Sequence, residues 1–151
     1  MREVVHDPYA SKCKLADPCA CSQCGAVYMA GRWQWRKETP DDMGRVVCPA
    51  CHRVNDQYPA GEITLSGNFM KQHTQEILGL LHHEADGENL EHPLNRIIAI
   101  REGTDQMVVT TTDIHLPNRL GHALERAFKG HSDVHFDQEG YFARAKWHRD
   151  K

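Results

Sequence analysis

Two Cys-x-x-Cys pairs are the residues of this chain best suited to chemistry. They are Cys21-Ser22-Gln23-Cys24 and Cys48-Pro49-Ala50-Cys51, with residues 25–47 between them. A gap of two residues lets one tight turn direct both sulfur atoms of a pair at the same ion. Four thiolates placed in this way form a closed, tetrahedral Zn²⁺ site. The spacing therefore predicts a structural zinc centre whose ligands are Cys21, Cys24, Cys48 and Cys51.

Two further cysteines leave part of this interpretation open. Cys19 stands two residues before Cys21 and offers an alternative sulfur for the first pair, although the two-residue gap favours Cys21. Cys13 and Cys19 can also be spare thiols that form a disulfide when zinc leaves. Metal ligation fits the six cysteines better than a disulfide framework, because the paired spacing is confined to the first third and no secretory signal is expected.

Composition and charge narrow the classes of function. The chain has 151 residues and a net charge of −3 with histidine neutral, so any attraction to nucleic acid must come from local patches. It contains no apolar run long enough to span a membrane. We expect a cytoplasmic protein with no membrane partner and no evident small-molecule substrate.

The elements that hold the cysteines are predicted to be a small zinc ribbon. Between the two pairs, residues 27–28 and 32–36 read as two short strands of a hairpin. Residues 52–61 are polar and rich in turn formers, which indicates a linker. The predicted organisation is an extended arm over residues 1–20, the ribbon and its linker over 21–61, and a second domain over 62–151.

The second domain alternates between strand and helix patterns. Ile63 and Leu65 alternate with polar residues as in a strand, and a helical pattern follows from Phe69 to a stop at Asp86-Gly87. Further on, the predicted elements are two β-branched runs at 96–100 and 107–112, a helix that Thr112 or Asp113 caps and Gly130 follows, and strands at 134–136 and 141–147. The fold class is therefore α+β, with a βαββαββ order like a split βαβ motif with one added strand.

Basic and aromatic residues gather in three stretches that suit contact with RNA, because rings can stack on bases while guanidinium groups engage phosphate. One stretch lies in the ribbon, one on the second helix around Arg119 and Arg126, and one at the C-terminus. The residues predicted to meet RNA or another partner are Arg32, Trp33, Trp35, Arg36, Arg144, Lys146 and Arg149.

Motifs of catalysis are not recognisable. The chain has no phosphate-binding glycine loop and no nucleophile motif, and His82-His83-Glu84 lacks the spacing that places two metal ligands and a base on one helical face. Four sulfur ligands would leave no position on zinc for a reactive water. We therefore expect that the protein is not an enzyme.

Several segments together resemble a known group of proteins. They are Cys21-x-x-Cys24, residues 47–53, residues 56–61 and the run from Val108 to Leu116. In these segments the chain resembles small bacterial zinc proteins related to the N-terminal zinc region of the large-ribosomal-subunit export adaptor family of eukaryotes and archaea. The resemblance implies zinc binding and a ribosomal partner, either ribosomal RNA or a ribosomal protein. The long remainder of the adaptor has no counterpart here, so export is not implied.

Two hypotheses of function follow. The first is a non-enzymatic zinc protein whose ribbon and α+β domain dock on the ribosome or on structured RNA. The alternative is a protein-interaction or redox-sensitive regulatory module, in which the thiols of Cys13 and Cys19 respond when zinc is lost.

Overall fold

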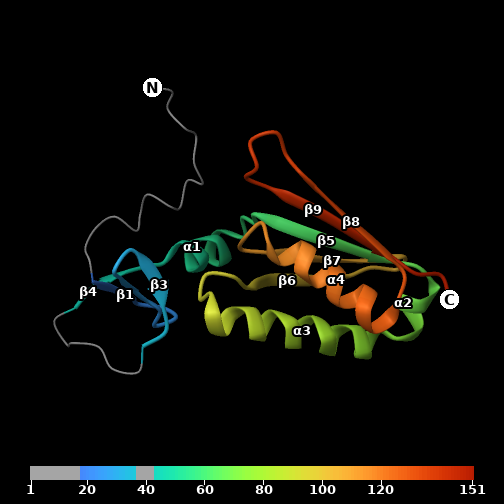
Figure 1. Cartoon of the computed structure of the whole chain (residues 1–151), viewed down its shortest axis with the longest axis horizontal. Coiled ribbons are helices and arrows are strands. Elements are labelled where there is room, and N and C mark those ends of the chain that lie inside the picture. Colours follow the sequence, from blue (N-terminus) through green and yellow to red (C-terminus); the bar gives the residue numbers. More distant parts are fainter. Residues whose placement is uncertain (1–17, 37–42) are drawn as a thin grey trace.

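The computed structural model describes residues 18–36 and 43–151, and it contains two separate β-sheets (Figure 1). The smaller sheet and the short helix after it carry the cysteine pairs, and we call this part the ribbon. The larger sheet and its helices form the α+β domain. The mixed α+β class, with a cysteine cluster ahead of the strand and helix pattern, is confirmed. Cys13 and most of the predicted arm lie outside the described residues.

The ribbon sheet has strands of three residues each. They are β1 (Cys19–Cys21), β2 (Val27–Met29), β3 (Arg32–Gln34) and β4 (Gly44–Val46), in the spatial order β3-β2-β1-β4. The predicted hairpin between the cysteine pairs is present as β2 and β3. Ala30 and Gly31 form its turn with φ values of 57° and 83°, and two positive φ angles match the twist of a tight hairpin.

A helix occupies the first half of the segment predicted to be a linker. Helix α1 spans Pro49–Asp56, and Gln57 ends it in the left-handed conformation. The prediction was wrong because the second cysteine pair itself starts the helix: the sulfur of Cys48 accepts the N–H of Cys51, and Pro49 has a fixed φ suited to the first turn. The polar composition of residues 52–56 hid this helix.

The α+β domain is built on a sheet of five strands. They are β5 (Gly61–Ser66), β6 (Ile97–Glu102), β7 (Gln106–Thr111), β8 (His131–Phe136) and β9 (Ala143–His148). Their spatial order is β6-β7-β5-β9-β8, with β5 and β9 parallel and the other neighbours antiparallel. The predicted βαββαββ order is confirmed, and the one added strand, β9, lies between β5 and β8.

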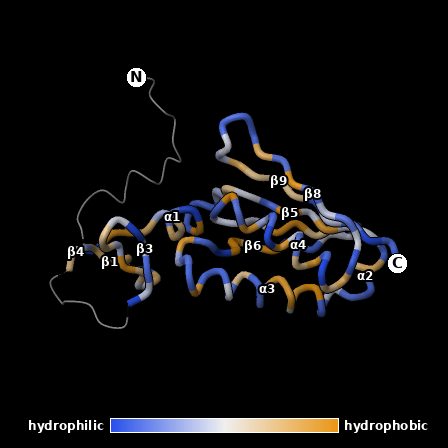
Figure 2. The backbone as a smooth tube through the Cα atoms, in the orientation of Figure 1, coloured by the Kyte–Doolittle hydropathy of each residue, from blue (hydrophilic) through white to orange (hydrophobic). Residues whose placement is uncertain are grey.

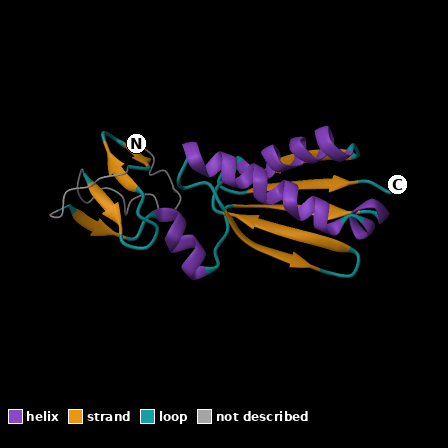
Figure 3. Cartoon of the chain, turned by 90° about the horizontal axis from the view of Figure 1, so that it is seen from below, coloured by secondary structure: helices purple, strands orange, loops and turns teal. Residues whose placement is uncertain are grey.

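Three helices accompany this sheet: α2 (Asn68–Gln72), α3 (Thr74–Glu91) and α4 (Leu116–Phe128). The longer two, α3 and α4, cover one face of the sheet (Figures 1 and 3). The first predicted helix is in fact interrupted at His73, and it continues through Gly87 to Glu91. A glycine costs a helix only about 1 kcal/mol, and here the final turns are held by side-chain bonds from Asn95 and Arg119 to Glu88.

The main core lies between the sheet and these two helices, and hydrophobic stretches run along these elements (Figure 2). Ile63, Leu65 and Trp147 contribute from the sheet, and Leu81 and Leu120 contribute from the helices, all fully buried. Burying one such side chain stabilises a fold by about 1.5–3 kcal/mol. The α+β domain therefore has a core of its own, distinct from the few buried residues of the ribbon.

The opposite face of the sheet carries polar residues. On β9, Ala143, Ala145 and Trp147 point into the core, whereas Arg144, Lys146 and His148 alternate with them and are exposed. No helix in the described part of the chain packs on this side (Figure 3). We call it the open face.

Candidate metal centre

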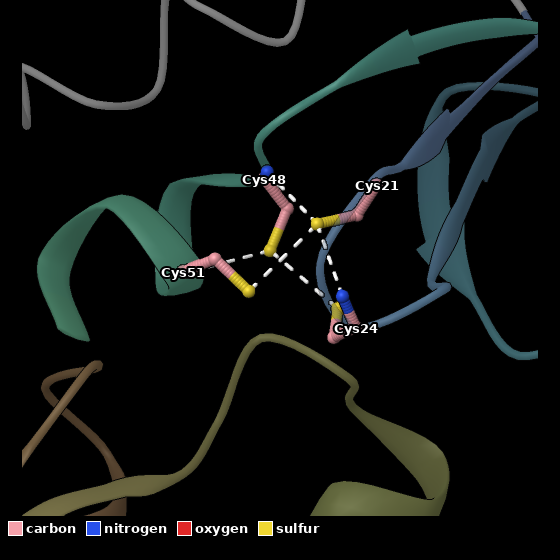
Figure 4. A group of neighbouring side chains, drawn as sticks. All are labelled: Cys21, Cys24, Cys48 and Cys51. Atoms are coloured by element: carbon pink, nitrogen blue, oxygen red, sulfur yellow. Dashed lines mark hydrogen bonds between the residues drawn. The ribbon is translucent and has the colours of Figure 1, made fainter. Parts of the chain in front are cut away.

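Four cysteines from two parts of the ribbon converge on one point (Figure 4). Cys21 ends β1 and Cys24 follows in the next turn, while Cys48 caps α1 and Cys51 lies in its first turn. Their four sulfur atoms all lie within 4.8 Å of one another. Cys19 is fully buried in β1 but does not belong to this group. The geometry therefore selects Cys21, and not Cys19, as the partner of Cys24 in the first pair.

The spacing of the sulfur atoms fits a tetrahedral ion. Cys21 Sγ lies 3.7 Å from Cys51 Sγ, and Cys24 Sγ lies 3.8 Å from Cys48 Sγ. A tetrahedron with metal–sulfur bonds of about 2.3 Å has edges of about 3.8 Å. A disulfide needs sulfur atoms about 2 Å apart. The cluster thus has the dimensions of a metal site and not those of two disulfides.

Backbone N–H groups point at the sulfur atoms and favour their ionised form. Cys21 Sγ accepts from the N–H groups of Gln23, Cys24 and Cys48 at 3.3–3.5 Å, and Cys48 Sγ accepts from that of Cys51 at 3.3 Å. Such donors are supplied by the tight turn of each pair, and hydrogen bonds to a charged group stabilise the charge. The turns therefore position the ligands and also prepare them to bind a cation.

A side chain from the α+β domain completes the centre. The guanidinium of Arg96 donates to three of the four sulfurs: to Cys51 Sγ at 3.4 Å, Cys24 Sγ at 3.2 Å and Cys48 Sγ at 3.4 Å. Burial acts against the charge of Arg96, but the hydrogen bond to Cys51 and the nearby charges of Cys24 and Cys48 outweigh it and raise the pKa of the guanidinium. Sequence reasoning missed Arg96, because nothing in the local pattern around it points to cysteines.

The pKa values of the cysteine thiols are shifted in different directions. The hydrogen bond with Cys48 lowers the pKa of Cys24 to about 4, and the same bond raises the pKa of Cys48. Burial raises the pKa of Cys51, against the opposing effect of Arg96. A metal ion binds thiolates, so it must displace the protons that remain on the cluster. Metal affinity is therefore expected to fall as the solution becomes acidic.

The two tryptophans predicted to face RNA are used within the protein. Trp33 packs against the cysteine cluster and lies 5.5 Å from the ring of Tyr28, centroid to centroid. Trp35 is 39% exposed, and its indole N–H donates to the backbone oxygen of Asn89 at 2.7 Å. Arg32 and Arg36 are exposed nearby. The ribbon thus offers basic side chains to solvent, whereas the ring of Trp33 packs against the cluster and that of Trp35 stays partly exposed.

The three C-terminal residues of the predicted set divide between two surfaces. Arg144 and Lys146 lie on the open face, where Arg144 pairs with Glu62 at 3.1 Å. Arg149 instead lies over the ring of Phe69, 3.9 Å from its centroid, and donates to the backbone oxygen of Phe128. The structure therefore does not gather the seven predicted residues into one patch.

Comparisons with protein-family models, with curated proteins and with solved structures found no match for this chain. Among the described helices, none combines the length and the apolar composition that a membrane span requires. The resemblance to the export adaptor family therefore stays a prediction, and the metal centre is the feature on which function can be argued.

Proposed function

We propose that this protein is a non-enzymatic zinc protein that docks on the ribosome or on structured RNA. The observation that carries the metal-binding part of the proposal is the closed cluster of four cysteine sulfurs, and docking is argued from the charge of the open face. An all-sulfur tetrahedral set selects zinc or iron among the common metals, and in zinc proteins four cysteine ligands mark structural sites, since no position is left for substrate or water. Zinc in this role stabilises a small sheet that has few buried residues of its own.

The open face supports contact with the phosphate backbone. Its basic side chains are Arg101 on β6 and Arg144 and Lys146 on β9, and three histidines, at 131, 135 and 148, stand on the same face. Glu62 and Asp133 are the acidic residues among these strand positions. The local charge is therefore positive although the chain as a whole is negative, which suits a local electrostatic contact with a polyanion.

The kind of RNA follows from what the open face lacks. The described strand positions that point to this face carry no phenylalanine, tyrosine or tryptophan, and the ring of Phe142, just before β9, is already covered by the guanidinium of Arg144 at 4.8 Å from its centroid. Proteins that hold single strands usually stack bases on such rings, whereas folded RNA is recognised by its shape and by its phosphates and 2′-hydroxyls. Structured RNA, such as that of a ribosomal subunit, is the better fit to this surface.

Sedimentation with ribosomal particles at several salt concentrations tests the proposal. We expect association at low salt that weakens as salt rises, because phosphate contacts release counterions. In the double variant Arg144→Ala/Lys146→Ala, the slope of log affinity against log salt should fall by about 2, since each contact contributes about 1. The control Lys71→Ala removes one positive charge that lies outside the open face, where Lys71 pairs with Asp105, and should change the slope little.

Two results would count against this function. Absence of the wild-type protein from every ribosomal fraction at low salt would overturn docking altogether. Capture of a protein without RNA, unaffected by nuclease, would favour the alternative of a protein-interaction module. In both cases the metal centre itself could still be present, because it is measured separately.

A further inference from the structure

The contact between Arg96 and the cysteine cluster joins two parts of the molecule. Arg96 immediately precedes strand β6 of the α+β domain, whereas the four sulfurs belong to the ribbon. We propose that Arg96 is a positioning residue of the metal centre, which makes zinc binding and the docking of the ribbon on the α+β domain one linked equilibrium. This inference rests on the proposed zinc centre.

Charge is the first reason. Four thiolates around Zn²⁺ carry a net charge of −2, and the cluster is largely buried, so it needs a compensating cation or hydrogen-bond donors. Arginine suits this place because its planar group stays charged and presents several N–H donors in a fixed fork. Lysine would keep the charge, but its compact ammonium does not match the observed contacts with three sulfurs at once.

The second reason is that Arg96 is itself held firmly by its own domain. The backbone N–H of Arg96 donates to the hydroxyl of Thr112 at 2.9 Å, and the backbone oxygen of Arg96 accepts the N–H of Thr112 at 2.9 Å. Its Nε donates to the backbone oxygen of Pro93 at 3.2 Å. Thr112 is buried beside the end of β7. The backbone and Nε of Arg96 are therefore held by its own domain, while its two terminal nitrogens reach the sulfurs of the ribbon.

Further contacts join the same two parts around this bond. Leu94 packs against the cysteine cluster, and the indole N–H of Trp35 donates to Asn89 at the end of α3. The side chain of Asn89 in turn holds the backbone oxygens of Pro93 and Asn95 at 3.0 and 3.3 Å. Residues 89–96 thus form the surface of the α+β domain that contacts the ribbon. Loss of the ion removes the fixed anionic partner of Arg96 and should weaken the contact between this surface and the ribbon.

Zinc affinity in variants tests the proposal. The affinity of purified protein is measured by competition with a colorimetric zinc chelator for the wild type, Arg96→Gln, Arg96→Lys and the control Arg101→Gln. Arg101 is an exposed arginine on β6, the strand that Arg96 precedes. We expect Arg96→Gln to lower the affinity about 10- to 100-fold, as removal of groups bonded to metal ligands typically does. Arg96→Lys should fall between this variant and the wild type, and Arg101→Gln should match the wild type.

Hydrogen exchange on the wild type provides a readout that needs no variant to fold. On chelation of zinc, amides in residues 89–96 should exchange faster, while those of β5 and β9 in the main core keep their protection. If the wild type binds no zinc, the proposed metal centre fails. If it binds zinc but Arg96→Gln has wild-type affinity, or exchange at residues 89–96 is unchanged by chelation, the zinc centre stands and the role of Arg96 is refuted.

Discussion

Replacing Cys48 with serine separates the metal-binding role of this residue from its role in the fold. The sulfur of Cys48 lies 3.8 Å from that of Cys24, accepts the N–H of Cys51 at 3.3 Å and accepts a bond from Arg96 at 3.4 Å. Serine is among the best residues at a helix N-cap, so the hydroxyl should keep the bond that starts α1. What Cys48→Ser removes is one thiolate of four.

The size of the expected effect follows from these contacts. Loss of a group that only touches a ligand costs about 10- to 100-fold in metal affinity, and loss of a ligand should cost more. We therefore expect zinc affinity to fall by at least about 100-fold, which is about 2.8 kcal/mol at 1.4 kcal/mol per factor of ten. The stability that zinc confers on the ribbon should fall with it, because an ion that binds the native state stabilises that state.

Competition with a zinc chelator, combined with circular dichroism melts at fixed free zinc, measures both quantities. Cys19→Ala is the matched control, since Cys19 is equally buried on the same strand as Cys21 but lies outside the cluster. It should keep one zinc per chain at near wild-type affinity. The reasoning is refuted if Cys48→Ser binds zinc within threefold of the wild type, or if Cys19→Ala loses the ion instead.

Two further predictions concern the α+β domain. Trp147→Ala should lower the free energy of unfolding by about 3–5 kcal/mol in a urea titration, because this ring is fully buried and its indole N–H donates to the backbone oxygen of Lys129. The folded variant should still bind zinc with unchanged stoichiometry, since Trp147 lies in the main core and not at the cysteine cluster, and loss of zinc from the folded variant would contradict this separation. Burial raises the pKa of Asp113, so the native state holds this proton more tightly than the unfolded chain, and its contribution to stability is greatest in acid and declines as pH rises through the native pKa. Asp113→Asn keeps an acceptor for the N–H groups of His115 and Leu116 but removes the charge. Relative to this variant, the wild type should lose stability as the pH rises above about 4, the ordinary pKa of an aspartate, and parallel profiles would count against the effect.

The cysteine pairs and the main core could be predicted from sequence because their patterns are local. A two-residue gap between cysteines has one common geometric use, and the alternation on β5 and β9 states directly which side chains are buried. The choice between Cys19 and Cys21 required the structure, since both are buried on the same short strand.

Neither helix α1 nor the role of Arg96 could be predicted from the sequence, each for its own reason. The start of α1 depends on a sulfur cap and a proline, and its residues have no apolar stripe to reveal it. Arg96 reaches Cys51 across 45 residues of sequence, and an arginine before a β-branched strand looks like any solvated charge. The contacts of the tryptophans within the protein were also not predictable from sequence: Trp33 packs against the cysteine cluster, and the indole N–H of Trp35 donates to Asn89.

X-ray absorption at the zinc edge, together with metal analysis of the purified protein, tests most directly that the four cysteines form a structural zinc centre. The account predicts about one zinc per chain, surrounded by four sulfur atoms at about 2.3 Å and by no nitrogen or oxygen ligand. A zinc shell with oxygen or nitrogen ligands, or a reduced protein that takes up no zinc, would contradict it.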